Sequence, residues 1–588
     1  MYVFDIECYI NYFLAVFYDP DDGRNTRIFE YVQDKNNPNE LKAFFKNEQM
    51  RKTLFVSFNG LNYDIPIIQA FIHGNSLEDL KKISDEIIKK GKKHWQILKD
   101  CPQLELNHID LKEVAPGHAG LKLYAARMHY PKLQELPIDP ESVIEKNQYS
   151  VLKEYCLNDC KITYELFNKL KKAIDLRVSL SEQYGVDLRS KSDAQIAENV
   201  VLSEIGIKSK KIDHPEKVKF IRPEWMKFKH FDLEILCCQF EEFDFEIDNG
   251  KIRLPGFFKE KNNDTVQVFG NHYSTGIGGL HSIEKSRSIK SDKNKILIDR
   301  DVASYYPSII LNRDLYPPQL GKKFIDVYRG LVEKRLDAKR IGDKSTADSL
   351  KITINGCFGK LNSIYSNIYA PELFINVTVT GQFALLMLIE RLGFNGINVI
   401  SANTDGILIY ESRDRYEEIN LIIQQWEKDT GFNTEETIYR AFYQKDVNNY
   451  IAFTDDGKTK LKGLYSKPGF MKNPTNEICV EAAIEYLKNK SPIEEKIRNC
   501  KDITKFVTIR TVNGGAYFNG ESIGKICRWY YDGKGRNFEY KNGNRVPKSV
   551  NAAPLFDLHF PNDLDYDYYI KETKLIINSF SKLKQIKF

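Results

Sequence analysis

The sequence predicts a soluble multidomain protein of mixed α/β and α+β class. Its 588 residues correspond to about four domains of roughly 150 residues each. Hydrophobic residues make up 42% and charged residues 28% of the chain, a composition that excludes a disordered or fibrous protein. Strand-like and helix-like segments alternate over the first part of the chain. A strand, a helical hairpin and a pair of strands follow later.

The composition restricts the location of the protein more than its partners. A net charge of +5 is close to neutral, so it neither supports nor excludes a nucleic-acid partner. No apolar run is long enough to predict a membrane span, and the N-terminal segment contains Asp5 and Glu7 and is not a secretory signal. The ten cysteines form no CxxC pair. We therefore expect a reduced, cytoplasmic protein with no membrane partner.

Residues 1–185 predict an α/β domain. Residues 2–18 and Leu54–Phe58 are strand-like, and the turn Asn59-Gly60 follows the second segment. Residues 76–98 and 151–186 carry the charge pattern of helices.

The middle of the chain predicts a different arrangement. From Lys293 a strong strand-like segment, KILID, leads to Tyr306-Pro307. Residues 324–341 and 346–359 then predict two helices joined by a short turn. Residues 396–410 predict a strand, a tight turn at Thr404-Asp405-Gly406 and a second strand. The last 140 or so residues, rich in Lys and Asn, are the least informative.

A first set of carboxylates falls in the N-terminal domain. Asp5 and Glu7 lie two apart in a strand and therefore share a face, as a divalent metal site with oxygen ligands requires. Alone, such a pair is usually a solvated strand face. Asp64 and Asp159 strengthen the case, because each follows closely after a Tyr.

A second set falls in the middle of the chain. Asp301 ends a strand and Asp405 lies at a hairpin tip, so the two could together hold the metal ions used in phosphoryl or nucleotidyl transfer. Arg335 and Lys339 share one face of the first helix of the hairpin. Lys351 shares a face of the second helix with Asn355, Phe358 and Gly359, which would suit a triphosphate beside a base pair. By itself this is the pattern of an ordinary charged helix pair.

The N-terminal segments resemble the Exo I (DxE), Exo II (Nx₂₋₃[F/Y]D) and Exo III (Yx₃D) motifs of DnaQ-like 3′–5′ exonucleases, in the same order. The resemblance implies an RNase H-like exonuclease domain. It also implies that Asp5, Glu7, Asp64 and Asp159 hold two metal ions and that Tyr155 orients the attacking water. The frayed 3′ end would be held by Phe58, Asn59, Asn62 and Tyr63.

The later segments resemble the polymerase motifs of family B (α-like) DNA polymerases. Motif A (Dx₂SLYP) is matched at Asp301, Ser304, Tyr306 and Pro307; motif B (Kx₃NSxYG) is matched at Lys351, Asn355 and Gly359. Motif C (DTDS) stands as Asn403-Thr404-Asp405-Gly406. The six ordered motifs together cover most of the chain, and they imply a right-hand palm, fingers and thumb after the exonuclease.

The resemblance also assigns roles by position. Asp301 and Asp405, with the Val302 carbonyl, would bind two metal ions, and Tyr306 would exclude a 2′-OH. Arg335, Lys339 and Lys351 would hold the triphosphate, while Asn355, Phe358 and Gly359 would line the nucleotide site. DNA contacts would come from Gly278, Gly279, Tyr450, Lys460 and Lys462.

Several positions depart from the family pattern. Asn403 replaces the first Asp of motif C, and Gly356 and Phe358 replace the Ser and Tyr of motif B. The segment 275–279 keeps the glycines of the YxG[G/A] motif without its Tyr, and Asn448 stands at the Lys of the KxY motif. Asp299, one strand period before Asp301, would be an auxiliary carboxylate or, as we favour, a structural one.

We expect exonuclease at 1–185, palm at 186–320 and 363–440, fingers at 321–362, and thumb with C-terminal region at 441–588. The intervals from Asp301 to Lys351 and from Gly359 to Asn403 are short, which disfavours the protein-primed branch of the family and its extra segments. The early position of Asp5 leaves no room for a domain before the nuclease. Such compactness is typical of phage and mobile-element polymerases.

The sequence therefore predicts a monomeric DNA polymerase with proofreading that binds primer-template DNA, dNTPs and replication accessory proteins. Each of its two sites would use two Mg²⁺ ions, with Mn²⁺ as a substitute. Three alternatives stay open. The polymerase half could be a decayed, DNA-holding scaffold beside an active exonuclease, as Asn403 would suggest. The chain could be a non-enzymatic DNA-binding accessory protein, or it could start chains without a primer, as a primase does.

Overall fold

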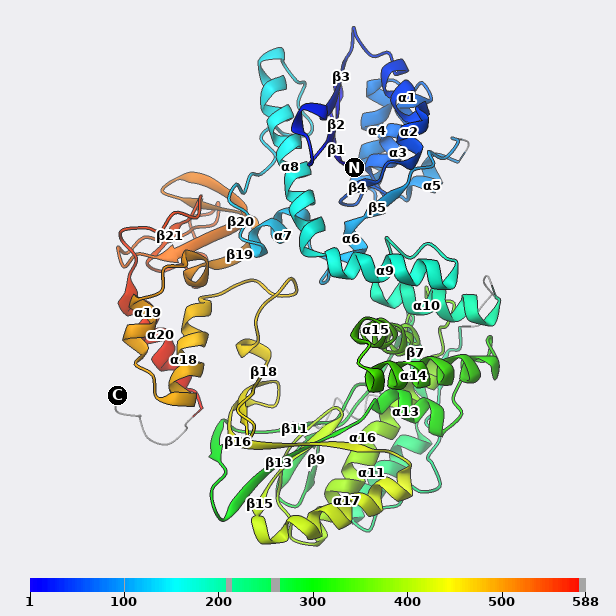
Figure 1. Cartoon of the computed structure of the whole chain (residues 1–588), viewed down its shortest axis with the longest axis vertical. Helices are drawn as coiled ribbons and strands as arrows, with labels where there is room; N and C mark the ends of the chain where they lie inside the picture. The colour runs from blue at the N-terminus through cyan, green and yellow to red at the C-terminus, as the bar shows by residue number, and fades with distance from the viewer. Residues whose placement is uncertain (100, 208–213, 255–264, 581–588) are drawn as a thin grey trace. The chain divides into compact units, whose positions relative to one another are not determined.

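The computed structural model describes residues 1–99, 101–207, 214–254 and 265–580 (Figure 1). The chain forms two compact units. Unit 1 consists of Met1–Ser192, Pro468–Ile478 and Arg498–Tyr569; unit 2 consists of Asp193–Lys467, Cys479–Ile497 and the segment from Ile570 onward. The chain therefore passes from one unit to the other more than once.

Unit 1 is built around a five-stranded sheet. Its order is β3 (Arg27–Val32), β2 (Tyr12–Tyr18), β1 (Tyr2–Cys8), β4 (Phe55–Ser57) and β5 (His108–Asp110). Strand β1 pairs antiparallel with β2 and parallel with β4. The strand-like segment 2–18 is thus a pair of strands that meet at a turn.

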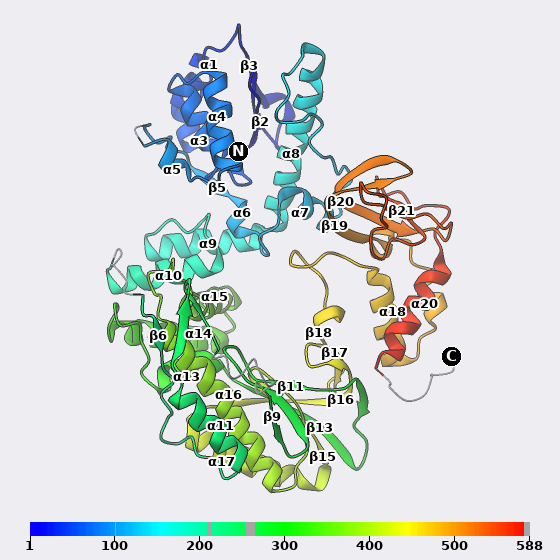
Figure 2. The same cartoon turned by 180° about the vertical axis from the view of Figure 1, so that it is seen from behind.

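Helices cover both faces of this sheet, as Figures 1 and 2 show from opposite sides. Phe4 and Ile6 pack with α1 (Asn39–Lys46), α3 (Asp64–Ile72) and α4 (Leu77–Ile88), whereas Val3 packs with α8 (Tyr149–Lys169). Because side chains alternate along a strand, Asp5 and Glu7 lie on the α8 face with Val3. The helix predicted at 151–186 is interrupted at Leu170, after which α9 (Lys171–Tyr184) begins.

A second, three-stranded sheet in unit 1 comes from the C-terminal part of the chain. It consists of β19 (Thr508–Phe518), β20 (Glu521–Tyr531) and β21 (Ala552–Pro554). The buried Arg528 of β20 donates hydrogen bonds to four carbonyls, those of Tyr130, Pro131, Leu555 and Phe556, at 2.8–3.0 Å. Strands β19 and β20 also contact α7 (Leu121–Arg127), so this sheet packs against the N-terminal part of the chain.

Unit 2 contains a ten-stranded sheet. Its central strand β13 (Lys295–Val302) lies antiparallel between β15 (Gly406–Ser412) and β16 (Thr434–Asp446). Beyond β15 come β14 (Val399–Asn403), β11 (His281–Ile283), β10 (Asn271–Ser274) and β9 (Thr265–Val268). Beyond β16 come β17 (Asn449–Thr454) and β18 (Thr459–Lys462), and β12 (Arg287–Lys290) also pairs with β16.

The helical hairpin expected in the middle of the chain is present. Helix α14 (Lys323–Ile341) ends at Gly342, whose φ of 75° suits glycine, and Asp343 caps the start of α15 (Lys344–Lys360). Helix α10 (Asp193–Ile205) packs against both helices. The other large helices of unit 2 are α11 (Phe231–Glu242), α13 (Tyr305–Asn312), α16 (Pro371–Phe394) and α17 (Tyr416–Thr430).

One helix among the described residues, α16, is long and apolar enough to cross a membrane by length and composition alone. Its apolar stretch is 89% buried within the protein. It packs against α13, α17 and β14, and Trp426 of α17 donates a hydrogen bond to the carbonyl of Ala384 at 2.9 Å. A helix that is buried on all sides is apolar all round, which accounts for this composition.

Residues 441–588, expected to form the thumb and C-terminal region, are divided between the two units. Residue 441 lies within β16, and strands β17 and β18 extend the central sheet of unit 2. Residues 498–569 belong to unit 1 together with residues 1–192. The positions of these segments are determined by strand pairing and by the hydrogen bonds of Arg528. Both join residues that are far apart in the chain.

Candidate active sites

Four acidic residues from three elements meet on the α8 face of the first sheet. Asp5 and Glu7 project from β1, Asp64 opens α3, and Asp159 lies on α8, which packs against β1 and β2. Asp64 and Asp159 are buried. The structure thus brings together the four carboxylates that the sequence predicted as one site.

Burial raises the pKa values of all four carboxyl groups, and neighbouring carboxylates add to this for Asp5, Glu7 and Asp64. Burial, and then the charge of Asp159, raise the pKa of Asp5 from 3.8 to about 7. Burial, and then neighbouring carboxylates, raise the pKa values of Glu7 and Asp64 well above their usual range. So many buried acids would be costly without a cation to offset their charge.

A divalent cation fits this cluster. Ligand atoms of Asp5, Glu7 and Cys156 lie within 4.8 Å of one another. Among the described residues, Asp64 Oδ1 is buried and has no hydrogen-bond partner. Closely spaced carboxylate oxygens such as those of Asp5, Glu7 and Asp64 are the ligands that Mg²⁺ or Mn²⁺ prefers.

Lys122 supplies a positive charge to this site and was missed in the sequence. Its Nζ forms an ion pair with Asp159 and lies 4.3 Å from the centre of the Tyr155 ring. Burial, and then the nearby carboxylates Asp159, Glu7 and Asp5, raise the pKa of the Tyr155 hydroxyl. Lys122 lies on α7, and no spacing relates it to the other site residues, so only the fold could reveal it.

Asp110 holds the loop that precedes Asp64 in place. The Asp110 carboxylate accepts hydrogen bonds from the backbone N–H groups of Asn59 and Leu61, at 2.7 and 3.0 Å. Asn59 adopts a φ of 72°, and a Cβ at Gly60 would lie 2.0 Å from Ser57 Oγ, so the loop requires glycine there. The loop is therefore preformed.

The aromatic residues predicted to hold a 3′ end have contacts of their own. The Phe58 ring meets Tyr124 edge to face at 5.9 Å. The Tyr63 hydroxyl bonds Ser84 Oγ at 2.8 Å, and Asn62 Nδ2 lies 3.4 Å from Asn59 Oδ1.

In unit 2, Asp301 lies near the end of β13, beside the turn between β14 and β15 that carries Asp405. Asp301 pairs in register with Gly406 of β15 and with Glu435 of β16. The Val302 N–H donates to the Asp405 carbonyl at 2.6 Å, which fixes the turn that carries Asp405. A Cβ at Gly406 would lie 2.1 Å from Asp301 Oδ1, so only glycine lets the two carboxylates approach.

Cations from the helical hairpin line the same cavity of about 480 Å³ as Asp301 and Asp405. They are Arg335, Lys339 and Lys351. Arg335 Nη1 donates to Ser304 Oγ at 3.2 Å, and within the described chain its buried Nε has no partner. A guanidinium with a free donor beside two lysines is suited to bind a phosphate.

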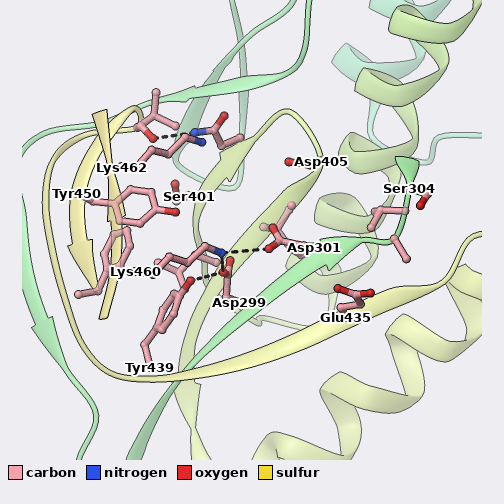
Figure 3. A pocket seen from close by; sticks show the side chains of 18 of the residues that line it. Asp299, Asp301, Ser304, Ser401, Asp405, Glu435, Tyr439, Tyr450, Lys460 and Lys462 are labelled. Atoms are coloured by element: carbon pink, nitrogen blue, oxygen red, sulfur yellow. Dashed lines mark hydrogen bonds and ion pairs between the residues drawn. The ribbon is translucent and has the colours of Figure 1, made fainter. Parts of the chain in front are cut away.

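Two further lysines approach the carboxylates from β18. Lys460 Nζ lies 2.9 Å from Asp299 Oδ2 and 3.2 Å from Asp301 Oδ2, as Figure 3 shows. Burial opposes the charge of Lys460, but the carboxylates outweigh it and raise its pKa. Burial, and then the charge of Lys460, lower the pKa of Lys462, which Asp405 partly offsets.

Burial, and then the charge of Asp301, raise the pKa values of both Asp299 and Asp405. Asp299 also accepts a hydrogen bond from Tyr439. Glu435, Tyr439 and Ser401 line the cavity but belong to no motif, so sequence reasoning missed them. Their positions follow from strand register, which the local sequence does not fix.

A family model described as a predicted 3′-5′ exonuclease related to the exonuclease domain of PolB matches residues 13–189. A DNA polymerase 1 of Sulfolobus acidocaldarius is 25% identical over 139 residues, which are 22% of this chain and 15% of the relative. The DNA polymerase of Archaeoglobus fulgidus is 22% identical over 236 residues, 34% of this chain and 30% of the relative. Residues 13–189 thus resemble the exonuclease domain of PolB, and parts of the chain resemble archaeal DNA polymerases.

A solved structure of the family B DNA polymerase from Pyrobaculum calidifontis aligns with 100% of this chain and 78% of its own, at 14% identity and a TM-score of 0.40. The chain spans less than a third of the length of each of the two curated relatives described above. The family model begins at residue 13, so Asp5 and Glu7 lie just before the matched segment.

The fold accounts for two departures from the family B motifs. A Cβ at Gly356 would lie 2.7 Å from Ala197 Cβ and 2.9 Å from the Asp193 carbonyl, so the packing of α10 against α15 excludes the Ser of motif B. Asn403 Nδ2 donates to the Val447 carbonyl at 2.8 Å. An Asp at that position could not make this bond when ionised.

The remaining motif B residues lie beside motif A. The rings of Tyr306 and Phe358 pack together at 4.3 Å, and burial raises the pKa of Tyr306 to about 12. Asn355 is exposed on α15, and a Cβ at Gly359 would meet open space.

The residues of unit 2 predicted to contact DNA lie around the turn Asn403-Thr404-Asp405-Gly406. Gln382 of α16 holds the glycine-rich segment, donating to the carbonyls of Gly276 and Gly278 at 2.7 Å. A Cβ at Gly279 would lie 2.8 Å from the Thr404 side chain, so this glycine lets the segment pack against the turn. Tyr450 lines the cavity, with Lys462 Nζ 6.0 Å from its ring centre.

Proposed function

We propose that the chain is a DNA-directed DNA polymerase with 3′–5′ exonuclease activity, which adds dNTPs to a primer 3′-OH. The main support is that Asp301 and Asp405 share a cavity with Arg335, Lys339 and Lys351. The paired carboxylates can bind metal ions, and the cations opposite them can balance the negative charge of a dNTP. The separate carboxylate cluster of unit 1 supports a second, hydrolytic site.

In the polymerase site, the protein positions the reactants and balances charge. Asp301 and Asp405, with the Val302 carbonyl, would bind Mg²⁺ or Mn²⁺, two ions per site, which would neutralise developing charge and favour the ionised 3′-OH. Arg335 would donate a hydrogen bond from its Nε–H group to the triphosphate, and Lys339 and Lys351 would add positive charge. Tyr306, held against Phe358, would exclude a ribose 2′-OH.

In the exonuclease site, Asp5, Glu7, Asp64 and Asp159 would bind the corresponding pair of ions. Tyr155 would orient the attacking water, and Lys122 beside it would balance the charge of the phosphodiester. The loop held by Asp110 would present Asn59 and Asn62 to the strand end.

A labelled primer annealed to a longer template tests both activities. Wild type, Asp5→Ala and Asp301→Ala are each incubated with Mg²⁺, with and without dNTPs. We expect Asp301→Ala to lose extension by at least about a thousandfold and to keep degradation, and Asp5→Ala to do the reverse. Loss of both activities in either variant would contradict two separate sites.

A second candidate is an exonuclease whose polymerase half only holds DNA. It is favoured by the replacement at Asn403, whose amide is committed to Val447, and by a family model that covers only the exonuclease domain. Wild type that degrades the primer but never extends it would establish this second function.

We further propose that the polymerase acts as a monomer on primer-template DNA, together with replication accessory proteins. Its compact motif spacing supports a role in copying phage or mobile-element DNA. Sedimentation of the protein with and without primer-template would test the oligomeric state.

A further inference from the structure

Helix α10 packs against both helices of the α14–α15 hairpin, which carries the cations of the polymerase cavity. Figures 1 and 2 show α10 beside α15 from opposite sides. The two helices approach so closely that a Cβ at Gly356 of α15 would overlap Ala197 of α10. Because packed helices leave no slack, the position of α10 limits the position of α15.

The residue after Ala197, Glu198, brings a carboxylate into this contact, and only 7% of the residue is exposed. Its Oε1 accepts hydrogen bonds from the backbone N–H and the side-chain Nδ2 of Asn367, both at 2.7 Å. Its Oε2 accepts from Ser366 Oγ at 3.0 Å and lies 3.9 Å from Lys360 Nζ. A buried carboxylate is costly unless it is paired, and here both of its oxygens are engaged.

The partners of this carboxylate lie where the hairpin leads back to α16. Lys360 ends α15, and Ser366 and Asn367 belong to the segment 361–370 that follows it. Gln319 holds the same segment from another side, donating to the Asn367 carbonyl at 3.1 Å. The carboxylate on α10 therefore fixes the end of α15 and the connection after it.

Helix α15 carries residues expected to contact the nucleotide. Near its end, the Phe358 ring packs against Tyr306 at 4.3 Å and stacks on Phe374 of α16 at 5.2 Å. Earlier on the same helix, Lys351 lines the cavity that contains Asp301. Because a helix moves largely as a rigid element, a displacement of its end would move both Phe358 and Lys351.

We propose that Glu198 is a positioning residue for the incoming nucleotide. By holding the end of α15, it places Lys351 for the triphosphate and supports Phe358 against Tyr306, the residue proposed to exclude a ribose 2′-OH. Glu198 acts through α15 and belongs to none of the sequence motifs. This inference rests on the proposed polymerase activity and adds a residue that determines nucleotide selection.

Primer extension opposite a template thymidine, measured over a range of dATP and ATP concentrations, tests this role. We expect Glu198→Ala to raise KM for dATP about tenfold, with kcat within about threefold of wild type. The preference for dATP over ATP, as a ratio of kcat/KM values, should fall about tenfold because Tyr306 loses its support. Glu198→Gln should stay within about threefold of wild type, because Gln Oε1 can still accept both hydrogen bonds from Asn367.

Glu390→Ala is the matched control. Glu390 is also a buried carboxylate of unit 2 (3% exposed), and it accepts from the N–H groups of Lys229 and His230 at 2.8 and 2.7 Å. Its removal should lower the midpoint of thermal unfolding as much as Glu198→Ala does. It should leave KM for dATP and the preference for dATP unchanged.

A milder variant tests the same contact with less risk to folding. Asn367→Ala removes one donor to Glu198 and keeps the backbone N–H, so we expect KM for dATP to rise about threefold. The double variant should resemble Glu198→Ala alone, because the two side chains act through one contact. Effects that multiply in the double variant would contradict this contact.

The outcomes separate this inference from the proposed function. A wild type that extends the primer at no dATP concentration would refute the polymerase assignment, and this inference with it. If wild type extends the primer and Glu198→Ala keeps the wild-type KM and preference, the polymerase stands and the inference fails. Equal changes in Glu198→Ala and Glu390→Ala would indicate a general loss of stability and would also overturn it.

Discussion

The absence of one side chain, at Gly406, allows the polymerase-type carboxylates to meet. A Cβ there would lie 2.1 Å from Asp301 Oδ1 and 2.9 Å from the Arg300 carbonyl. We predict that Gly406→Ala displaces Asp301 and lowers primer extension by about a hundredfold or more, with degradation unchanged. Gly330→Ala is the control, because nothing lies within 4 Å of a Cβ at that position. Extension by Gly406→Ala at the wild-type rate would show that Asp301 need not hold this position.

The buried side chain of His108, beside the loop that precedes Asp64, makes the stability of the protein depend on pH. Its Nε2 and Ser57 Oγ are 2.8 Å apart, and Ser57 Oγ accepts from the Gly60 N–H. Burial lowers the pKa of His108 from 6.5 to about 4, so below pH 6.5 the unfolded chain takes up a proton that the folded protein excludes. Stability is therefore lost as the pH falls from about 6.5 towards 4, by about 2 kcal/mol between pH 6.5 and 5.

Urea titrations of wild type and His108→Gln at several pH values test this prediction. The variant should be less stable at pH 7 but should lose about 2 kcal/mol less between pH 6.5 and 5. Parallel pH profiles for the two proteins would contradict it.

At the scale of elements, close packing between α10 and α15 selects glycine at position 356. We predict that Gly356→Ser destabilises the protein by about 1–3 kcal/mol, because its Cβ would overlap Ala197. Ala197→Gly in the same chain should recover part of the loss, since it removes the atom at 2.7 Å. Thermal unfolding of the two single variants and the double variant measures this coupling, and purely additive effects would refute it.

Some of the elements and site residues could be predicted from the sequence, and others could not. Motif residues such as Asp64 and Asp405 follow strands or turns that local patterns reveal, so their grouping was predictable. Lys122 was not, because α7 meets α8 only in the fold. Glu435 was not, because its place opposite Asp301 depends on strand register. The three-stranded C-terminal sheet depends on Arg528, whose partners Tyr130 and Pro131 are about 400 positions earlier in the chain.

At the scale of the whole molecule, Arg528 fastens the C-terminal sheet to the exonuclease domain. Arg528→Met would leave the carbonyls of Tyr130, Pro131, Leu555 and Phe556 without their donor. We predict a loss of about 3 kcal/mol or more and faster proteolysis within 498–569. Arg498→Met is the control, since Arg498 forms an exposed pair with Asp567 that contributes little. Equal proteolysis of the two variants would show that the hydrogen bonds of Arg528 are not needed to hold the C-terminal sheet in place.

The repeated passage of the chain between the two units has a consequence during synthesis. Unit 1 begins with Met1 but is complete only once Tyr569 has been made. At 5–20 residues per second, the ribosome needs roughly 20–75 s to travel from the end of the first segment to that point. Throughout this interval the surface of α7 that will receive the C-terminal sheet stays uncovered on the nascent chain. Chaperones that bind nascent chains could reach this surface, and ribosome pausing between residues 192 and 498 would prolong its exposure.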